Sequence, residues 1–179
     1  MTTSIRWLPP AKIVTEGLQC RAEIDRDAVA EYADAMQAGA KFPPLIVFNA
    51  DDQYFLADGF HRLEAQKHIR QAKVACDVRP GGFVDALKFA LGANTTHGLR
   101  RTRDDVQKAV RMAYVHRKEL KLPDVPAANL IAGLIGCNHE TVKVQLAKFA
   151  SWKDATARTG KAADRRADGL EAARLTASA

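Results

Sequence analysis

The stretch LADGFHRLEA, at residues 56–65, holds the side chains of this sequence that are best suited to bind a phosphate. Gly59 separates an apolar run typical of a strand from a run typical of a helix. A helix that begins there would present free backbone N–H groups, which form a natural anion site. Arg62 could bind a phosphate with two hydrogen bonds, and His61 could donate a hydrogen bond or exchange a proton. A structural turn with an exposed arginine explains the same residues, so the motif alone leaves both interpretations open.

A second motif, NLIAGLIGCNHETVKVQLAKF at residues 129–149, has the spacing of a helix-turn-helix. Ala132 would let two helices approach closely, Gly136 would adopt a left-handed turn, and Val142 would fill the angle between the helices. Asn138 would cap the second helix, whose early residues would face DNA. The candidate DNA contacts are therefore Asn138, His139, Glu140, Thr141 and Lys143. The alternative interpretation is an ordinary corner between two helices.

The net charge is concentrated in the second half of the chain. From His97 onward there are 16 Lys and Arg against 9 Asp and Glu, a net of +7, which leaves 11 against 12, or −1, for residues 1–96. A one-sided positive field is typical of proteins whose partner carries phosphates, such as double-stranded DNA. Solvated positive surface without a binding role is the alternative.

Composition limits the class of protein. With 179 residues and 47% apolar content, the chain is typical of soluble globular proteins. The three cysteines, Cys20, Cys76 and Cys137, lie far apart, which argues against a disulfide framework or a thiolate zinc site. No run approaches the roughly 18 apolar residues of a membrane span. We therefore expect a cytoplasmic protein that does not act at a membrane.

Hydrophobic periodicity predicts the elements that position the glycine turn. The first half should form a helix from Asp25 that stops at Gly39, strands at 45–48 and 54–56 joined as a β-hairpin, a short helix at 61–69, a strand at 74–79 and a helix at 83–94. This order indicates a small α+β unit.

The second half should be helical. Thr102 and Asp105 have capping-box spacing, and the apolar residues that follow predict one long helix that continues to Leu120. The tail from Ser151 is basic, rich in alanine and poor in large apolar residues, so we expect a helix with little core or a partly disordered arm.

The order and spacing of these motifs resemble the ParB/sulfiredoxin superfamily, in particular the N-terminal domain of ParB-like partition proteins and their plasmid or phage relatives. The resemblance covers about residues 10–149 and is carried by LQCR, FPPLIVF, YFLADGFHRLEA, the later DALKFALGANTTHGLRRTRDD and the position of the helix-turn-helix. It implies an α+β fold in which a small mixed ParB/sulfiredoxin-like domain, residues 1–97, precedes an all-helical domain, residues 98–150, and a basic tail, residues 151–179.

The resemblance also implies a bound nucleotide, CTP with Mg²⁺. Gly59 and Arg62 match the family's phosphate-binding turn, and His61 replaces its first arginine. Asn94 matches an asparagine that helps to hold Mg²⁺, although Ala93 stands where the family has an acid. Together with a local basic cluster after Gly98, the candidate nucleotide contacts are Gly59, His61, Arg62, Asn94, Arg100 and Arg101. A solvated approach to the following helix is the alternative for the two later arginines.

The function that follows is a DNA-binding ParB-like protein in plasmid or chromosome partition or in transcriptional regulation. Its nucleotide would control the grip on DNA, with weak CTPase activity, homodimerisation and a partner ATPase as further expectations. The alternative is a superfamily enzyme, a small-molecule kinase of the free-serine type or a ParB-like nuclease or NTPase. Its candidate catalytic groups are Glu23, Asp58 and His61. We do not expect sulfiredoxin activity, because Phe60 occupies the position of the catalytic cysteine.

Overall fold

The computed structural model describes residues 4–93, 101–123 and 128–159, with side chains described as far as residue 149. Its elements are β1 (Ser4–Leu8), the 3₁₀ turn η1 (Pro10–Lys12), β2 (Ile13–Val14), α1 (Arg26–Gln37), β3 (Leu45–Ala50), β4 (Gln53–Asp58), α2 (Phe60–His68), β5 (Val74–Pro80), α3 (Phe83–Gly92), α4 (Arg103–Val115), α5 (Ala128–Ile135) and α6 (His139–Thr159). The predicted α+β class is confirmed.

The strands form one mixed five-stranded sheet in the order β1-β5-β3-β4-β2. β3 and β4 are an antiparallel hairpin, and β5 lies parallel to β3 on its other side. The hairpin turn consists of Asp51 and Asp52, both with positive φ, which aspartate tolerates better than most residues. β4 ends at Asp58, directly before Gly59.

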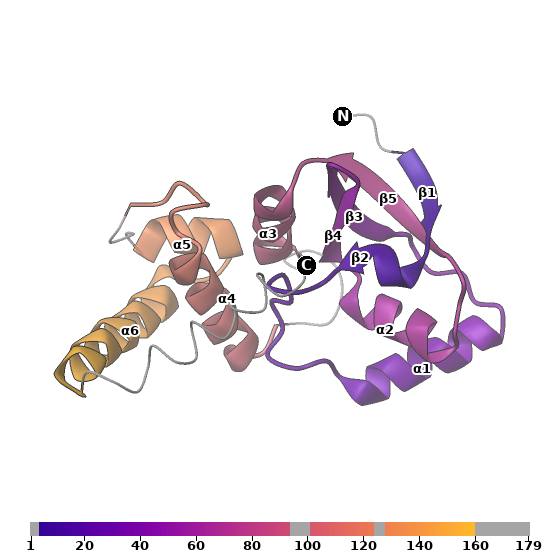
Figure 1. Ribbon diagram of the computed structural model, residues 1–179. Coiled ribbons are helices and arrows are strands. Elements are labelled where there is room, and N and C mark those ends of the chain that lie inside the picture. The colour runs from indigo at the N-terminus through magenta and orange to yellow at the C-terminus, as the bar shows by residue number, and fades with distance from the viewer. Residues whose placement is uncertain (1–3, 94–100, 124–127, 160–179) are drawn as a thin grey trace.

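The two faces of the sheet belong to different cores, because side chains alternate along each strand. Leu45, Val47 and Leu56 are buried together with Leu63 of α2. Their neighbours Ile46, Phe48 and Phe55 pack instead against the core that contains α3. Figure 1 shows the result: α1 and α2 cover one side, and α3 lies between the sheet and the α4–α6 helices.

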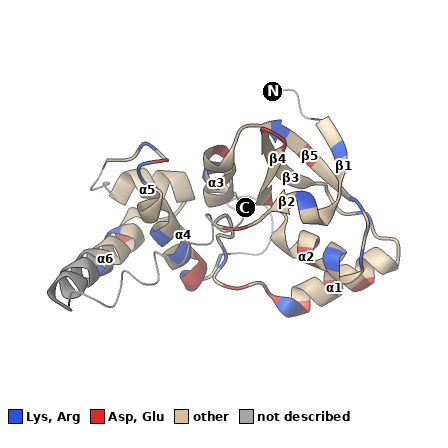
Figure 2. Ribbon diagram, in the orientation of Figure 1, with Lys and Arg blue, Asp and Glu red and all other residues tan. Residues whose placement is uncertain are grey.

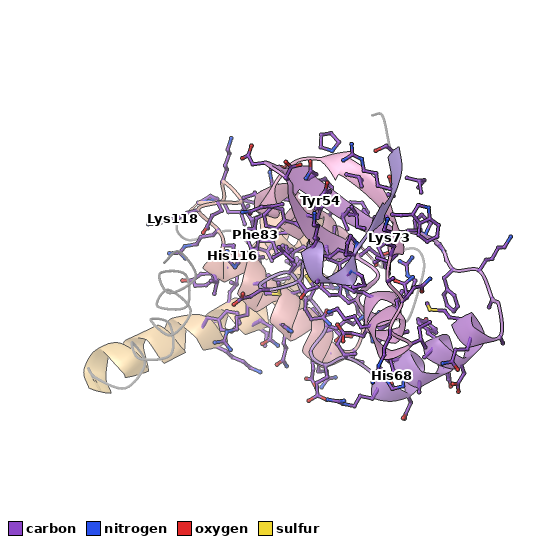
Figure 3. All side chains as sticks on the ribbon, turned by 45° about the vertical axis from the view of Figure 1, so that its right-hand side comes forward. Tyr54, His68, Lys73, Phe83, His116 and Lys118 are labelled. Atoms are coloured by element: carbon purple, nitrogen blue, oxygen red, sulfur yellow. The ribbon has the colours of Figure 1, made fainter. Side chains whose placement is uncertain are left out.

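The core around α3 continues into the helical half. Buried residues of α3, α4, α5 and α6 form one cluster, which includes Leu87, Val110, Ile131 and Val142. At the start of α3, the Phe83 ring also lies 5.4 Å from that of His116, centroid to centroid (Figure 3). The predicted division at residue 97 falls outside the described residues and stays a prediction.

Most predicted elements are confirmed, but the long helix to Leu120 is wrong. α4 ends at Val115, and the chain continues through turns in which the Leu120 N–H donates to His116 O and the Leu122 N–H to Arg117 O. Leu120 is nevertheless buried, so its apolar side chain belongs to the core although it follows the end of the helix. The capping box of Thr102 and Asp105 is confirmed.

The edge strands β1 and β2 were not predicted from the sequence. At the other end of the chain, residues 151–159 continue α6, and the rest of the predicted tail lies outside the described residues. No helix in the described part of the chain is both long enough and apolar enough to cross a membrane.

Candidate functional site

The turn at Gly59 requires glycine for two separate reasons. Its φ of +102° lies in the left-handed region, which residues with a Cβ rarely adopt. A Cβ would also lie 2.6 Å from Leu45 Cδ2 and 3.0 Å from Arg62 Nη2. α2 starts here without a side-chain cap, so the N–H groups of its first turn point out of the helix without an intrahelical partner.

Arg62 is directed into the protein rather than towards a ligand. Its Nη1 donates to Pro43 O at 2.6 Å and to Pro44 O at 2.9 Å, and its Nη2 pairs with Asp58 Oδ2 at 2.8 Å. Three of the five guanidinium donors are used in these bonds, and the side chain is only 14% exposed. Arg62 thus holds the segment before β3 against the glycine turn, and its phosphate contact stays a prediction.

His61 links the glycine turn to the start of α1. Its Nε2 accepts a hydrogen bond at 3.1 Å from the N–H of Asp25, whose own side chain caps α1. Burial lowers the pKa of His61, and the charge of Arg21 lowers it further, whereas Asp25 and Asp105 oppose the shift. The imidazole is therefore held neutral, with Nε2 as the acceptor and its proton on Nδ1.

An open cleft of about 780 Å³ lies beside His61, between the loop before α1 and the start of α4. Its lining residues are Arg21, Ala22, Glu23, Ile24, Asp25, Arg26, His61, Thr102, Asp104 and Asp105. Two cations, Arg21 and Arg26, line this cleft together with four carboxylates, and the neutral imidazole of His61 adds a hydrogen-bond donor at Nδ1. The cleft therefore suits a ligand that carries an anionic group together with hydrogen-bond donors.

The predicted catalytic carboxylates do not share a cavity. Glu23 lines the large cleft, whereas Asp58 lines a cavity of only about 20 Å³ and is paired with Arg62. In the part of the chain that the structure describes, no group of three or more His, Cys, Asp or Glu side chains could hold a metal ion. Asn94 and Arg100 lie outside the described residues.

Asp105 connects the cleft loop to the helical half, a role that sequence reasoning missed. Its carboxylate accepts from the N–H groups of Ala22 and Thr102, both at 2.8 Å, and pairs with Arg21 at 3.2 Å. Burial by itself raises the pKa of Asp105, but these N–H groups and Arg21 hold it below its ordinary value. Lys108 adds a bond to Arg21 O at 2.6 Å. The loop is therefore fastened to α4.

Arg101 does not line the large cleft beside His61, but it lines the small cavity of about 20 Å³ together with Asp58 and Phe60. Its guanidinium donates to backbone carbonyls at the ends of α3 and α5. The structure thus gives Arg101 a role in helix packing, and its predicted contact with phosphate stays a prediction.

The second motif forms the helical hairpin α5–α6. Gly136 has a φ of +72°, and its N–H donates to Ala132 O at 2.8 Å. Ala132 and Val142 are 6% and 0% exposed, so the small and β-branched residues occupy the packed angle between the helices. The predicted local geometry of these three residues is found; whether the hairpin meets DNA is a separate question.

The predicted DNA contacts lie together on the exposed first turn of α6. Asn138 caps the helix, with its Oδ1 accepting from the Glu140 N–H at 2.8 Å. Glu140 in turn pairs with His139 at 3.0 Å and, more loosely, with Lys143 at 3.9 Å. These side chains and Thr141 are exposed, and Figure 2 shows further basic residues on the neighbouring α4.

A family model and a curated protein each match part of this chain. The model of the ParB N-terminal domain family matches residues 1–95. A curated relative, the "Streptomycin biosynthesis operon possible regulatory protein" of Streptomyces griseus, is 35% identical over 72 residues, which are 40% of this chain and 20% of that protein. The chain thus matches only a fifth of the length of that relative.

Two solved structures of ParB proteins were superposed on this chain, and one of them shares its fold. The pNOB8-like ParB-N domain superposes with a TM-score of 0.59 at 13% identity, covering 89% of this chain and 74% of that one. The chromosome-partitioning protein ParB of Caulobacter crescentus, complexed with CTP-γ-S, gives 0.47 at 15% identity and 88% coverage of both chains. Because the family model spans more than half of the 179 residues, this chain belongs to the ParB N-terminal domain family.

Proposed function

We propose that this chain binds double-stranded DNA through the α5–α6 hairpin and that a nucleotide bound beside Gly59 controls this binding. The observation that carries the proposal is the exposed first turn of α6, which is presented by a hairpin whose inner residues are fully packed. A rigid, buried support with polar and basic side chains on its outer turn is the arrangement that reads a major groove.

The proposed DNA contacts are the cap and first turns of α6. Lys143 and His139 would approach phosphates, while Asn138, Glu140 and Thr141 carry the donors and acceptors that can read base edges. The +7 charge of the second half supplies the sequence-independent part of the affinity, which falls as salt rises.

The proposed nucleotide site is the cleft beside the glycine turn. The first-turn N–H groups of α2 favour an anion, and Arg21, Arg26 and His61 line the adjoining space. Arg62 would contribute its remaining donors, with Asn94 and Arg100 from the segment outside the described residues. Family membership favours CTP with Mg²⁺, whose triphosphate would supply the anionic charge. Because Asp105 fastens the cleft loop to α4, a ligand there would act on the helical half as well.

The biological role that fits best is a nucleotide-controlled regulator or partition factor at the nucleoid or on a plasmid. The printed name of the Streptomyces relative, a possible regulatory protein, favours regulation. A homodimer would match a two-fold symmetric operator. In partition the protein would act with a partner ATPase.

The test of DNA binding is a charge reversal in α6 against a matched one elsewhere. A pool of random-sequence duplexes is first selected for binding, and the affinity of the enriched sequence is measured by fluorescence anisotropy at several salt concentrations. Lys143→Glu should weaken binding about tenfold and lower the salt slope by about 1. Lys41→Glu, which changes the net charge equally at an exposed site in the first half, should leave both unchanged. Equal effects of the two variants would contradict the hairpin assignment.

The test of nucleotide binding is calorimetric titration with CTP, ATP and GTP in the presence of Mg²⁺. Arg26→Ala removes a cleft cation that has exposed side-chain surface, and we expect it to weaken CTP binding about tenfold. Absence of heat with all three nucleotides, both with and without the selected DNA, would remove the nucleotide from the proposal and leave the DNA-binding role standing.

A small-molecule kinase is the second candidate, favoured by one observation. Glu23 is an exposed carboxylate in the same cleft as Arg21 and His61, so it could act as a base towards a hydroxyl beside a bound phosphate. Incubation of the protein with ATP and free serine, followed by chromatography of the products, tests this role. Phosphoserine formed by the wild type and lost in Glu23→Gln would support the kinase; no product would exclude it for serine.

A further inference from the structure

Two helix ends that belong to different halves of the molecule meet at one point. α3, which covers the sheet, packs with its last turn against α5, the first helix of the hairpin. At Gly92 a Cβ would lie 3.5 Å from Leu134 O, so the two carbonyl-bearing ends are close together. Each helix end carries unsatisfied carbonyls and about half a negative charge. Two such ends side by side repel each other unless a cation lies between them.

The guanidinium of Arg101 lies between these two ends. Its Nη1 donates to Ile135 O of α5 at 2.8 Å. Its Nη2 faces the α3 end, at 2.7 Å from both Leu91 O and Ala93 O and at 3.3 Å from Ala90 O. One side chain therefore caps both helices.

The charge of Arg101 persists in this half-buried position. Burial lowers the pKa of Arg101, but arginine remains protonated in proteins because its ordinary pKa lies so far above neutrality. A lysine could supply the positive charge but not the forked set of donors of a guanidinium, because its single ammonium cannot reach two helix ends in opposite directions. A neutral side chain would leave carbonyls of both ends without a donor.

We propose that Arg101 is the positioning residue that fixes the α5–α6 hairpin on α3 and so sets the direction in which α6 faces. The halves are also joined by the shared apolar core, by the tilted contact of the Phe83 and His116 rings at the opposite end of α3, and by Asp105, which fastens the loop at residues 21–22. Loss of Arg101 therefore removes the polar link between the ends of α3 and α5 and loosens the hairpin, while the sheet half keeps its own packing.

Hydrogen exchange of the full chain, read peptide by peptide, tests this role without any DNA. In Arg101→Gln, amides of α5 and of α6 as far as residue 149 should exchange about tenfold faster, whereas those of β3, β4 and α2 keep the wild-type rate. In Arg101→Lys, the exchange rate of the hairpin amides should lie between those of the wild type and Arg101→Gln. Arg111→Gln removes an exposed arginine of α4 and should change neither region. A uniform acceleration in Arg101→Gln, or none in the hairpin, would overturn the proposal.

A second measurement, which rests on the proposed DNA binding, distinguishes a failure of the positioning role of Arg101 from a failure of DNA binding. Arg101→Gln should weaken binding to the selected duplex while leaving the salt slope unchanged, because the guanidinium donates to backbone carbonyls at the two helix ends. If the wild type selects no duplex but the hairpin responds in exchange, the positioning role stands and DNA binding fails. If Lys143→Glu weakens DNA binding but Arg101→Gln does not change the hydrogen exchange of the hairpin amides, only the positioning role fails.

Discussion

The two glycine turns of this protein have similar backbones but opposite surroundings. Gly59 and Gly136 both have positive φ, +102° and +72°, and each precedes a helix that begins within three residues. Around Gly59 the polar side chains turn inward: Arg62 binds the carbonyls of residues 43 and 44, and His61 binds the start of α1. After Gly136, the polar side chains of the first turn of α6 are exposed.

The two turns would therefore present a binding site to a partner in different ways. At the first turn Arg62 and His61 bind other parts of the protein, so a ligand would meet backbone N–H groups and the cations of the neighbouring loop. At the second turn the backbone serves only to place the helix, and the side chains themselves would meet the partner. We therefore expect substitutions at the first turn to alter stability, and substitutions at the second to alter binding.

The largest effect should come from a methyl group at the first turn. Gly59→Ala forces a left-handed alanine and places its Cβ 2.6 Å from Leu45 Cδ2, so we expect a loss of about 3 kcal/mol in the free energy of unfolding. Gly136→Ala has the same backbone penalty, for which we expect about 1 kcal/mol. Urea unfolding followed by circular dichroism measures both.

Gly133 supplies the matched control for these two variants. It lies inside α5 with open space around the position of a Cβ, so Gly133→Ala should stabilise the protein by about 0.5–1 kcal/mol. If Gly59→Ala costs no more than Gly136→Ala, the crowding at the first turn is not what distinguishes the two turns.

An intermediate effect should come from the arginine of the first turn. Arg62→Ala removes bonds to two carbonyls and to Asp58, and we expect it to cost about 2 kcal/mol, because those oxygens are left partly buried. Lys143→Ala, at an exposed position of the second turn's helix, should stay within about 0.5 kcal/mol. The same unfolding measurement compares them. Equal stabilities of the two variants would show that Arg62 is not a structural clamp.

Local sequence signals predicted the elements but not the partners of their side chains. The hairpin of β3 and β4, the capping box and the packing of Ala132 and Val142 depend on neighbours within a few residues, so spacing alone indicated them. The edge strands β1 and β2 are short and have no such signal. β1 exists through its register with β5, about seventy positions later in the chain.

The partners of the arginines could not be predicted from neighbouring residues either, because these partners lie far away in the sequence. Arg21 meets Asp105 across 84 positions, and Arg101 meets Ile135 across 34. Sequence shows that a guanidinium is available near a turn, but which oxygen it binds depends on how distant segments fold together. A basic residue beside a glycine therefore indicates an oxygen partner without deciding between a phosphate and a carbonyl of the protein itself.

The smallest effect should be the acid sensitivity of the first turn. Because burial lowers the pKa of His61 in the folded protein, the unfolded chain binds the proton more readily. The stabilisation by neutral His61 is therefore complete above its ordinary pKa of 6.5 and is lost as the pH falls through the lower folded value. His61→Gln keeps an acceptor for the Asp25 N–H but does not titrate. Urea unfolding across this range should show the wild type losing its advantage over His61→Gln on acidification, with Arg21, Asp25 and Asp105 present in both proteins. A difference that stays constant or grows in acid would mean that His61 is not held neutral, and the first turn would then offer a cation to the cleft, as the second turn offers Lys143 to its partner.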